Sequence, residues 1–378
     1  MIYLDYCANT PVDEAVLGCF CDTERRCIGN ANSHHRAGYA ARDLIRQATQ
    51  TVASTLGALP EEVIYTSGAS EANNLAIKGL ARLARHRGRH IIATPLEHSS
   101  VSGCLTALQE QGYEIDLLDL RPDGTPDLAH LQELLRPDTV LVAVSAVDSE
   151  LGVVQPVDAI ARLVHSVPGC RLHVDTTQAV GKIPVSFSGA DTMSLTAHKF
   201  YGLNGIGVLL KRRELVVEPL IHGGESTTIF RSGTPTTALI VSFAKALELA
   251  LAALPERFSA VQALNFRLRQ ALAAYPLVRI NSPDDAIPHI LNLSVQGVRG
   301  PAFQKALDEK GVCVSVKSAC SSDALPSRAV FAVSRDRKNA LSSWRISLSH
   351  RTTPEELTQF LQAFDSCYQD LTHTPGRG

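Results

Sequence analysis

The sequence predicts an α/β protein in which a large domain, built on a mostly parallel sheet with helices on both faces, carries a smaller α+β domain. Three observations support this fold class. The chain has 378 residues, more than one hydrophobic core usually holds. Short apolar runs alternate with helical patterns between residues 62 and 210. A long helical stretch over 237–275, broken at Pro255, then leads to a second and shorter set of strands and helices.

The expected elements follow from apolar periodicity and from the Gly and Pro residues that interrupt it. A short strand at 5–11 runs into a turn, and the helix expected from 37 to 56 ends at Gly57 and Pro60. In the large domain, placed at residues 15–250, strands are expected at 62–66, 90–94, 113–118, 139–147, 172–175, 191–196 and 205–210, with helices at 72–84, 98–111, 128–135 and 157–165. In the small domain, placed at 1–14 and 251–378, strands are expected at 278–281, 289–295, 312–316 and 344–348, with helices at 302–309 and 354–368.

Composition narrows the class of protein. Hydrophobic residues make up 45% and charged residues 20%, as in an ordinary globular protein, and the net charge of −2 gives no general attraction to nucleic acid or membranes. No apolar run reaches the roughly 18 residues of a membrane span. We therefore expect a soluble, untargeted, cytoplasmic protein with no direct nucleic-acid or membrane partner.

The nine cysteines do not predict a disulfide framework, because their number is odd and the chain is large. No Cys-x-x-Cys pair occurs, so we expect no metal, although Cys19, Cys21 and Cys27 near His34 and His35 keep a metal interpretation open. Free thiols in a reducing cytosol explain the cysteines better.

One apolar run, 191–196, ends in Thr196, and His198 and Lys199 follow before Gly202. Burial disfavours the charged form of a lysine, and an amine with a lowered pKa can attack carbonyl groups. Most lysines after strands simply extend into water, so this pattern alone leaves both interpretations open.

A second strand, 172–175, ends in Asp175, with Gln178 three residues later. Ligands of parallel sheets sit at the carboxyl ends of the strands, so this anion and amide are expected near Lys199. Pyridoxal phosphate requires such a set: a lysine for its aldehyde, a carboxylate for its ring nitrogen and a donor near its ring hydroxyl. No glycine-rich dinucleotide or Walker motif competes with this interpretation.

The segments 171–181 and 191–202, together with 317–322, make the chain similar to the cysteine desulfurases of the class V aminotransferase family. The resemblance runs from residues 3–6 to 343–347. It implies pyridoxal phosphate fold type I, conversion of L-cysteine to L-alanine, a homodimer with a shared active site, and an acceptor protein for the sulfur.

The resemblance also implies the cofactor contacts. Lys199 would attach to the aldehyde, Asp175 would pair with the ring nitrogen, Gln178 would donate near the ring hydroxyl, and His98 would stack on the ring and move protons. The turn 67–71 before a helix offers backbone N–H groups to an anion. The residues implied at the phosphate are Ala69, Ser70, Thr196, His198 and, from the partner subunit, Thr234.

For the substrate, the resemblance implies that Arg345 clamps the carboxylate and that Asn30 borders it. Asn30 could equally stabilise its own turn. Asp148-Ser149 stands where the family usually has two asparagines, so Ser149 would reach the ring hydroxyl less directly.

Cys320, among the small polar residues of 318–322, is the implied carrier of the sulfur as a persulfide. Lys317 replaces the usual glycine and could stiffen this segment or lower the pKa of the thiol.

The alternative function within the same class of enzyme is that of a selenocysteine lyase. A low-activity member that serves as an assembly scaffold is the alternative outside it. Iron–sulfur cluster assembly, tRNA thiolation and DNA phosphorothioation are the candidate pathways.

Overall fold

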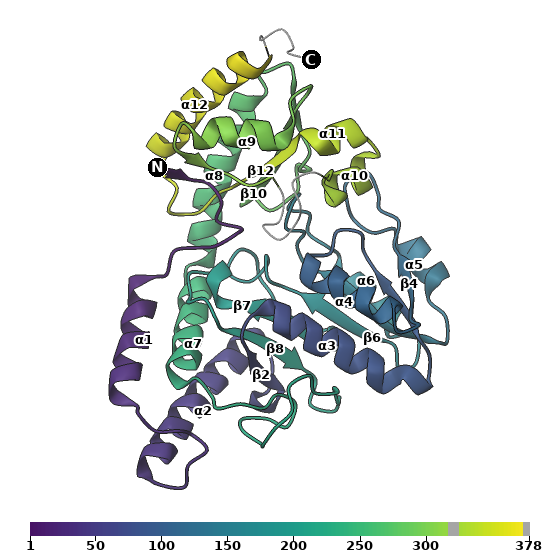
Figure 1. Cartoon of the computed structure of the whole chain (residues 1–378), viewed down its shortest axis with the longest axis vertical. Helices are drawn as coiled ribbons and strands as arrows, with labels where there is room; N and C mark the ends of the chain where they lie inside the picture. The colour runs from purple at the N-terminus through teal and green to yellow at the C-terminus, as the bar shows by residue number, and fades with distance from the viewer. Residues whose placement is uncertain (317–324, 373–378) are drawn as a thin grey trace.

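The computed structural model describes residues 1–316 and 325–372, and a seven-stranded sheet forms its centre (Figure 1). Neighbouring strands are parallel except where β8 pairs with β2 and β7. The predicted α/β class with a mostly parallel sheet is therefore confirmed. In spatial order the strands are β2 (Val63–Thr66), β8 (Gly207–Lys211), β7 (Thr192–Thr196), β6 (Arg171–Asp175), β5 (Thr139–Ser145), β3 (His90–Ala93) and β4 (Glu114–Leu117).

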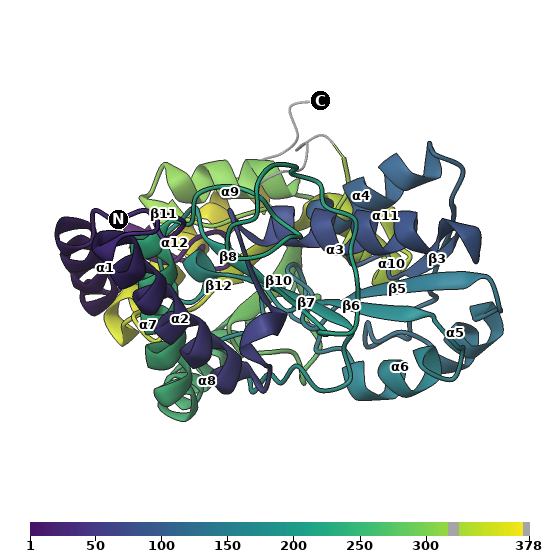
Figure 2. The same cartoon turned by 90° about the horizontal axis from the view of Figure 1, so that it is seen from below.

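Helices cover both faces of this sheet. Successive residues of a strand point to opposite faces, so each buried strand contributes side chains to both layers of packing. Ile91 packs with α3 (Ala69–Leu83) and α4 (Ser99–Gln109), whereas its neighbour Ile92 belongs to the core on the other face. Figure 2 shows α3 and α4 on one side and α5 and α6 on the other. The helices that contribute to the second face are α2 (Arg36–Leu56), α5 (Leu128–Leu134), α6 (Val157–Val164) and α7 (Thr237–Ala252).

A separate hydrophobic cluster lies around a three-stranded antiparallel sheet at the top of Figure 1. Trp344 stacks on Phe303 there, with ring centroids 5.1 Å apart. The N-terminal arm packs with this cluster, since Ile2 and Leu4 belong to it and β1 (Ile2–Tyr3) pairs in parallel with β11 (Val312–Cys313). The other elements are α8 (Leu254–Leu272), β9 (Val278–Ile280), β10 (Ile290–Val295), α9 (Gly300–Asp308), β12 (Ser343–Ser347) and α12 (Pro354–Thr372). The predicted domain boundaries themselves stay a prediction.

Several elements differ from those expected. Helix α1 (Glu14–Arg26) was not predicted, although Asp13 caps it by accepting the backbone N–H of Ala15. Two further short helices, α10 (Arg328–Ser334) and α11 (Arg337–Ser342), were also missed. The strand expected to extend to 316 ends at Cys313. Among the described residues there are also three short 3₁₀ turns: η1 (Pro60–Glu62), η2 (Ala84–His86) and η3 (Ala197–Lys199).

Within the described ranges, no single helix is both long and apolar enough to cross a membrane. Of the helices in the described part of the chain, α7 and α8 reach that length and hydropathy only when taken together, and they are bent by 64° at their junction.

Candidate active site

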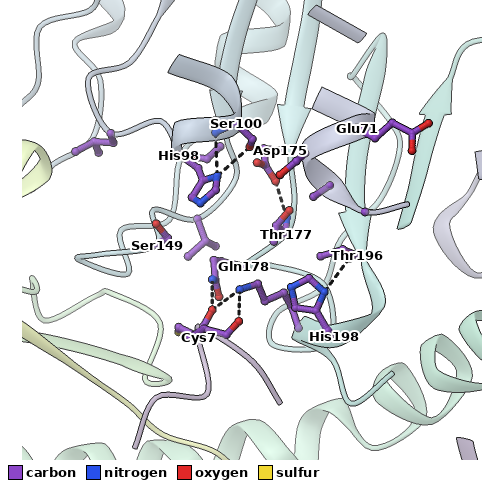
Figure 3. Close-up of a pocket in the computed structure, with 18 of the residues that line it drawn as sticks. Cys7, Glu71, His98, Ser100, Ser149, Asp175, Thr177, Gln178, Thr196 and His198 are labelled. Atoms are coloured by element: carbon purple, nitrogen blue, oxygen red, sulfur yellow. Dashed lines mark hydrogen bonds between the residues drawn. The ribbon is translucent and has the colours of Figure 1, made fainter. Parts of the chain in front are cut away.

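A cavity of about 350 Å³ opens at the carboxyl ends of β5, β6 and β7, within the size range of roughly 300–1,000 Å³ typical of small-molecule sites. Figure 3 shows His98, Asp175, Gln178 and His198 arranged around it. Strand ends, the start of α3 and the N-terminal segment all contribute to its wall. The predicted site residues that line the cavity are Ala69, Ser70, His98, Ser149, Asp175, Gln178, Thr196, His198, Lys199 and Arg345.

Lys199 lies in η3, directly after β7, and its amine is directed at the N-terminal segment. Nζ donates to the carbonyl oxygens of Cys7 (2.6 Å) and Ala8 (2.7 Å). Burial lowers the pKa of this amine, and the positive charge of Arg345 lowers it further. A lowered pKa favours the neutral form of the amine, which is the nucleophilic form.

Asp175 is the last residue of β6 and is buried. Its Oδ1 accepts the backbone N–H of Thr177 (2.9 Å), and its Oδ2 accepts Nδ2 of Asn73 (2.8 Å). Neutral donors thus fix the carboxylate without cancelling its charge, which leaves it able to pair with a cationic ring nitrogen.

Asn73, on α3, is a fully buried residue that sequence reasoning missed. Its amide donates to Asp175 and to Ser100 Oγ (2.8 Å), while its oxygen accepts from Ser194 Oγ and from His173 Nε2 (2.9 Å). All four hydrogen-bonding positions of the amide are therefore used. The available signal was an asparagine on the apolar face of a predicted helix.

His98 is the N-cap of α4, and its Nδ1 accepts the backbone N–H of Ser100 (3.1 Å). A backbone N–H can only donate, so the proton of the neutral ring lies on Nε2. Burial lowers the pKa of His98; the charges of Lys199 and Arg345 act in the same direction, against the opposing effect of Asp175. The ring is thus neutral near pH 7 and presents a transferable proton at Nε2.

The first turn of α3 contains Ala69 and Ser70, the residues at which the sequence predicts an anion site. Its N-cap is Gly68, which supplies no side-chain cap, so the backbone N–H groups of this turn remain available to a ligand. Thr196 and His198 lie beside it, joined by a 3.1 Å hydrogen bond between Oγ1 and Nδ1. Burial lowers the pKa of His198 to about 4, and a bound phosphate would raise it again.

Arg345, on β12, is 2% exposed and already has two partners. Nη2 donates to Asp5 Oδ1 (2.9 Å), and Nη1 donates to the backbone oxygen of Ser149 (2.7 Å). Nε has no partner among the described residues. Sequence reasoning missed Asp5, whose Oδ2 also accepts from Ser315 Oγ (2.8 Å).

Two predicted residues, Asn30 and Thr234, do not line this cavity. Asn30 is exposed, and its Oδ1 accepts the backbone N–H of Asn32, as expected if it stabilises its own turn. Thr234 is exposed in the loop before α7 and does not line the cavity of its own subunit. Cys320 and Lys317 lie outside the described residues.

Comparisons with known proteins agree over nearly the whole chain. The family profile described as Aminotransferase class-V matches residues 2–360. The chain is 35% identical to a NifS/IcsS protein homolog from Lactobacillus delbrueckii subsp. bulgaricus, covering 98% of both chains. It is 38% identical to the cysteine desulfurase IscS of Proteus mirabilis, covering 97% of this chain and 92% of the relative. A solved NifS-like protein superposes with a TM-score of 0.92 and 33% identity, covering 99% of this chain and all of the other.

Proposed function

The chain belongs to the class V aminotransferase family, and on this premise we propose that it is an L-cysteine desulfurase that passes sulfur to an acceptor protein. The predicted family, fold type and cofactor, pyridoxal phosphate, are confirmed by these comparisons. One observation carries the proposal: an amine of lowered pKa, a neutral imidazole, a buried carboxylate and an arginine from four separate elements share one cavity.

The residues of the cavity fit this cofactor. The uncapped start of α3 offers N–H groups to its phosphate, while Asp175 offers a carboxylate to its ring nitrogen. Lys199 supplies the amine for its aldehyde. When bound, pyridoxal phosphate supplies an electron sink for the bonds at the substrate's Cα.

The remaining groups bind substrate and move protons. Arg345 would hold the substrate carboxylate with N–H groups that Asp5 and Ser149 leave unused, because a guanidinium has five donors. His98 can deliver its proton from Nε2. Arg345 and His98 can take these two roles together because both line the same cavity.

Cys320 completes the proposed reaction. Its thiolate forms a bond to the substrate sulfur as the bond between that sulfur and Cβ breaks, and the electron pair stays on carbon. Protonation of the carbon yields alanine, and the protein keeps the sulfur as a persulfide. One cysteine and one thiol thus become one alanine and one persulfide.

The test measures alanine release from L-cysteine by the purified protein, with L-selenocysteine in parallel to detect a lyase preference. Lys199→Ala is expected to retain no covalently attached cofactor and to lose at least about a thousandfold in rate, because a covalent catalyst is removed. Cys320→Ser is expected to keep the visible absorption of the cofactor and to lose persulfide transfer. Alanine release that is unchanged in Lys199→Ala would refute the proposal.

The homodimer is part of the proposal. The loops that carry Asn30 and Thr234 lie together, since Asn32 Nδ2 donates to Ser226 Oγ (3.3 Å). Large apolar side chains are exposed on both loops: Ile28, Ile221 and Ile229. Burial of these side chains against a second copy would remove them from water, and a partner subunit there could receive Thr234 at its phosphate site. The identity of the sulfur acceptor and its pathway stay predictions.

A further inference from the structure

A second lysine lies buried beside the active site and has no part in the reaction proposed above. Lys182 is 7% exposed and follows β6, four residues after Gln178. Its Nζ donates to Gln178 Oε1 at 2.9 Å. Burying an ammonium costs free energy unless it is hydrogen-bonded, and the contact with Gln178 supplies that hydrogen bond.

The contact fixes which way the Gln178 amide points. An ammonium has donors and no acceptor, so the amide oxygen must face Lys182. The amide nitrogen then faces the other way, and Nε2 donates to the carbonyl oxygen of Cys7 (3.0 Å). That same carbonyl accepts from Lys199 Nζ. A continuous hydrogen-bonded chain therefore links the two lysines through one amide and one carbonyl.

We propose that Lys182 is a positioning residue, which locks the Gln178 amide with its nitrogen toward the active-site cavity. An amide nitrogen carries two protons, and the Cys7 carbonyl uses one of them. Gln178 lines the cavity, so the second proton is available to a ligand there. The inference rests on the proposed function, because the ligand that would use this donor is the ring hydroxyl of the cofactor.

The charge of Lys182 supports this role. Burial lowers its pKa to about 8, and the charges of Lys199 and Arg345 act in the same direction. The ammonium form, which can only donate, therefore still predominates at pH 7. A neutral amine could also accept a hydrogen bond and would no longer distinguish the two ends of the amide.

The test uses the visible absorption spectrum of the bound cofactor and its dissociation constant, neither of which requires turnover. Lys182→Met frees the amide to rotate, so we expect a shifted absorption maximum and about tenfold weaker cofactor binding, the size of one hydrogen bond. Lys182→Arg keeps a donor-only group and is expected to restore the spectrum. If the Met variant does not fold, Lys182→Gln replaces it, because an amide can donate or accept.

Lys211→Met is the matched control. Lys211, the last residue of β8, is also buried, at 1% exposed, but it donates to the backbone oxygens of Arg212 and Leu215 in the segment that follows the strand. Its loss should lower the melting temperature and leave the spectrum unchanged. In a Gln178→Ala background, Lys182→Met should cause no further spectral shift.

Two results would overturn the inference: an unchanged spectrum in Lys182→Met, or the same shift with and without Gln178. A different result would reject the proposed function. If the wild-type protein binds the cofactor but releases no alanine from cysteine, the desulfurase assignment fails whatever the Lys182 variants show.

Discussion

Asp148 is the residue for which the family resemblance would lead one to expect an asparagine. Its surroundings show what a carboxyl group does at this position. The side chain is fully buried, and its Oδ2 accepts the backbone N–H groups of Glu150 and Leu151. Oδ1 has no partner among the described residues. Burial, reinforced by the charge of Glu150, raises the pKa of Asp148 to about 7. Glu97, also buried, has its pKa raised to about 8, chiefly by burial.

Asp148→Asn is expected to flatten the dependence of stability on pH. The folded protein holds a proton on Asp148 that the unfolded chain releases near pH 4, so raising the pH toward 7 favours unfolding. Asparagine cannot titrate. The loss of unfolding free energy between pH 5 and pH 8 should therefore shrink by roughly 2–3 kcal/mol.

Urea unfolding at pH 5 and pH 8 measures this difference. The exposed Asp158→Asn on α6 is the control, and its pH dependence should match that of the wild type. If Asp148→Asn retains the full wild-type loss of stability, the buried carboxyl is not the group responsible.

Among the elements, β8 packs against the turn at which we propose the anion site. It was predicted as a strand, but only the structure shows that it inserts between β2 and β7 in the opposite direction. Gly207 therefore lies opposite both Thr66 and Thr196. A Cβ at Gly207 would come within 2.6 Å of the Gly68 Cα, so only glycine allows β8 to approach the turn that caps α3.

Gly207→Ala is expected to displace that turn. Because the atoms it meets belong to the backbone, the clash cannot be relieved by a side-chain rotation, and we expect destabilisation of about 1–3 kcal/mol. The affinity for pyridoxal phosphate should fall about tenfold as the N–H groups of α3 move.

Thermal melting and cofactor titration test both effects. Gly18→Ala on α1 is the control, because a Cβ there meets nothing within 4 Å. Unchanged cofactor affinity in Gly207→Ala would show that the start of α3 does not hold the phosphate.

At the scale of the whole molecule, the N-terminal segment joins the two parts of the structure at the active site. The Cys7 backbone N–H donates to Ser347 Oγ (3.0 Å) on β12, while the Cys7 carbonyl accepts from Lys199 after β7. Asp5 holds Arg345 from the same segment. The turn after β7, which carries Lys199, and β12, which carries Arg345, are therefore held relative to one another by a short stretch of backbone.

The proposed dimer predicts complementation between two defective subunits. Lys199→Ala inactivates its own site, and Thr234→Asp should impair the site of the partner by placing a negative charge beside the phosphate. In a mixed dimer, the subunit with an intact Lys199 receives a wild-type Thr234, so one site of two is restored.

Co-expression with two affinity tags isolates this mixed dimer. Its alanine release should approach half that of the wild type, whereas each parent homodimer should be at least about tenfold slower than wild type. Activity in the mixed dimer no higher than in the parents would place Thr234 outside the partner's site.

The local pattern of the chain determined much of the site. Lys199 and Asp175 follow apolar strands, and the start of α3 follows a glycine turn, so short stretches of sequence placed them at one edge of the sheet. The short helices α10 and α11 were not predicted, because a helix of so few residues shows no clear helical period of apolar side chains.

Tertiary structure alone decided the partners of these groups. Asn73 meets Asp175 across 102 residues of chain, and Asp5 meets Arg345 across 340. Lys182 is close to Gln178 in sequence, yet its role depends on the Cys7 carbonyl far away. The physical reason is that a strand or turn reflects the preferences of consecutive residues, whereas the partner of a buried polar group is set by which distant elements pack against it.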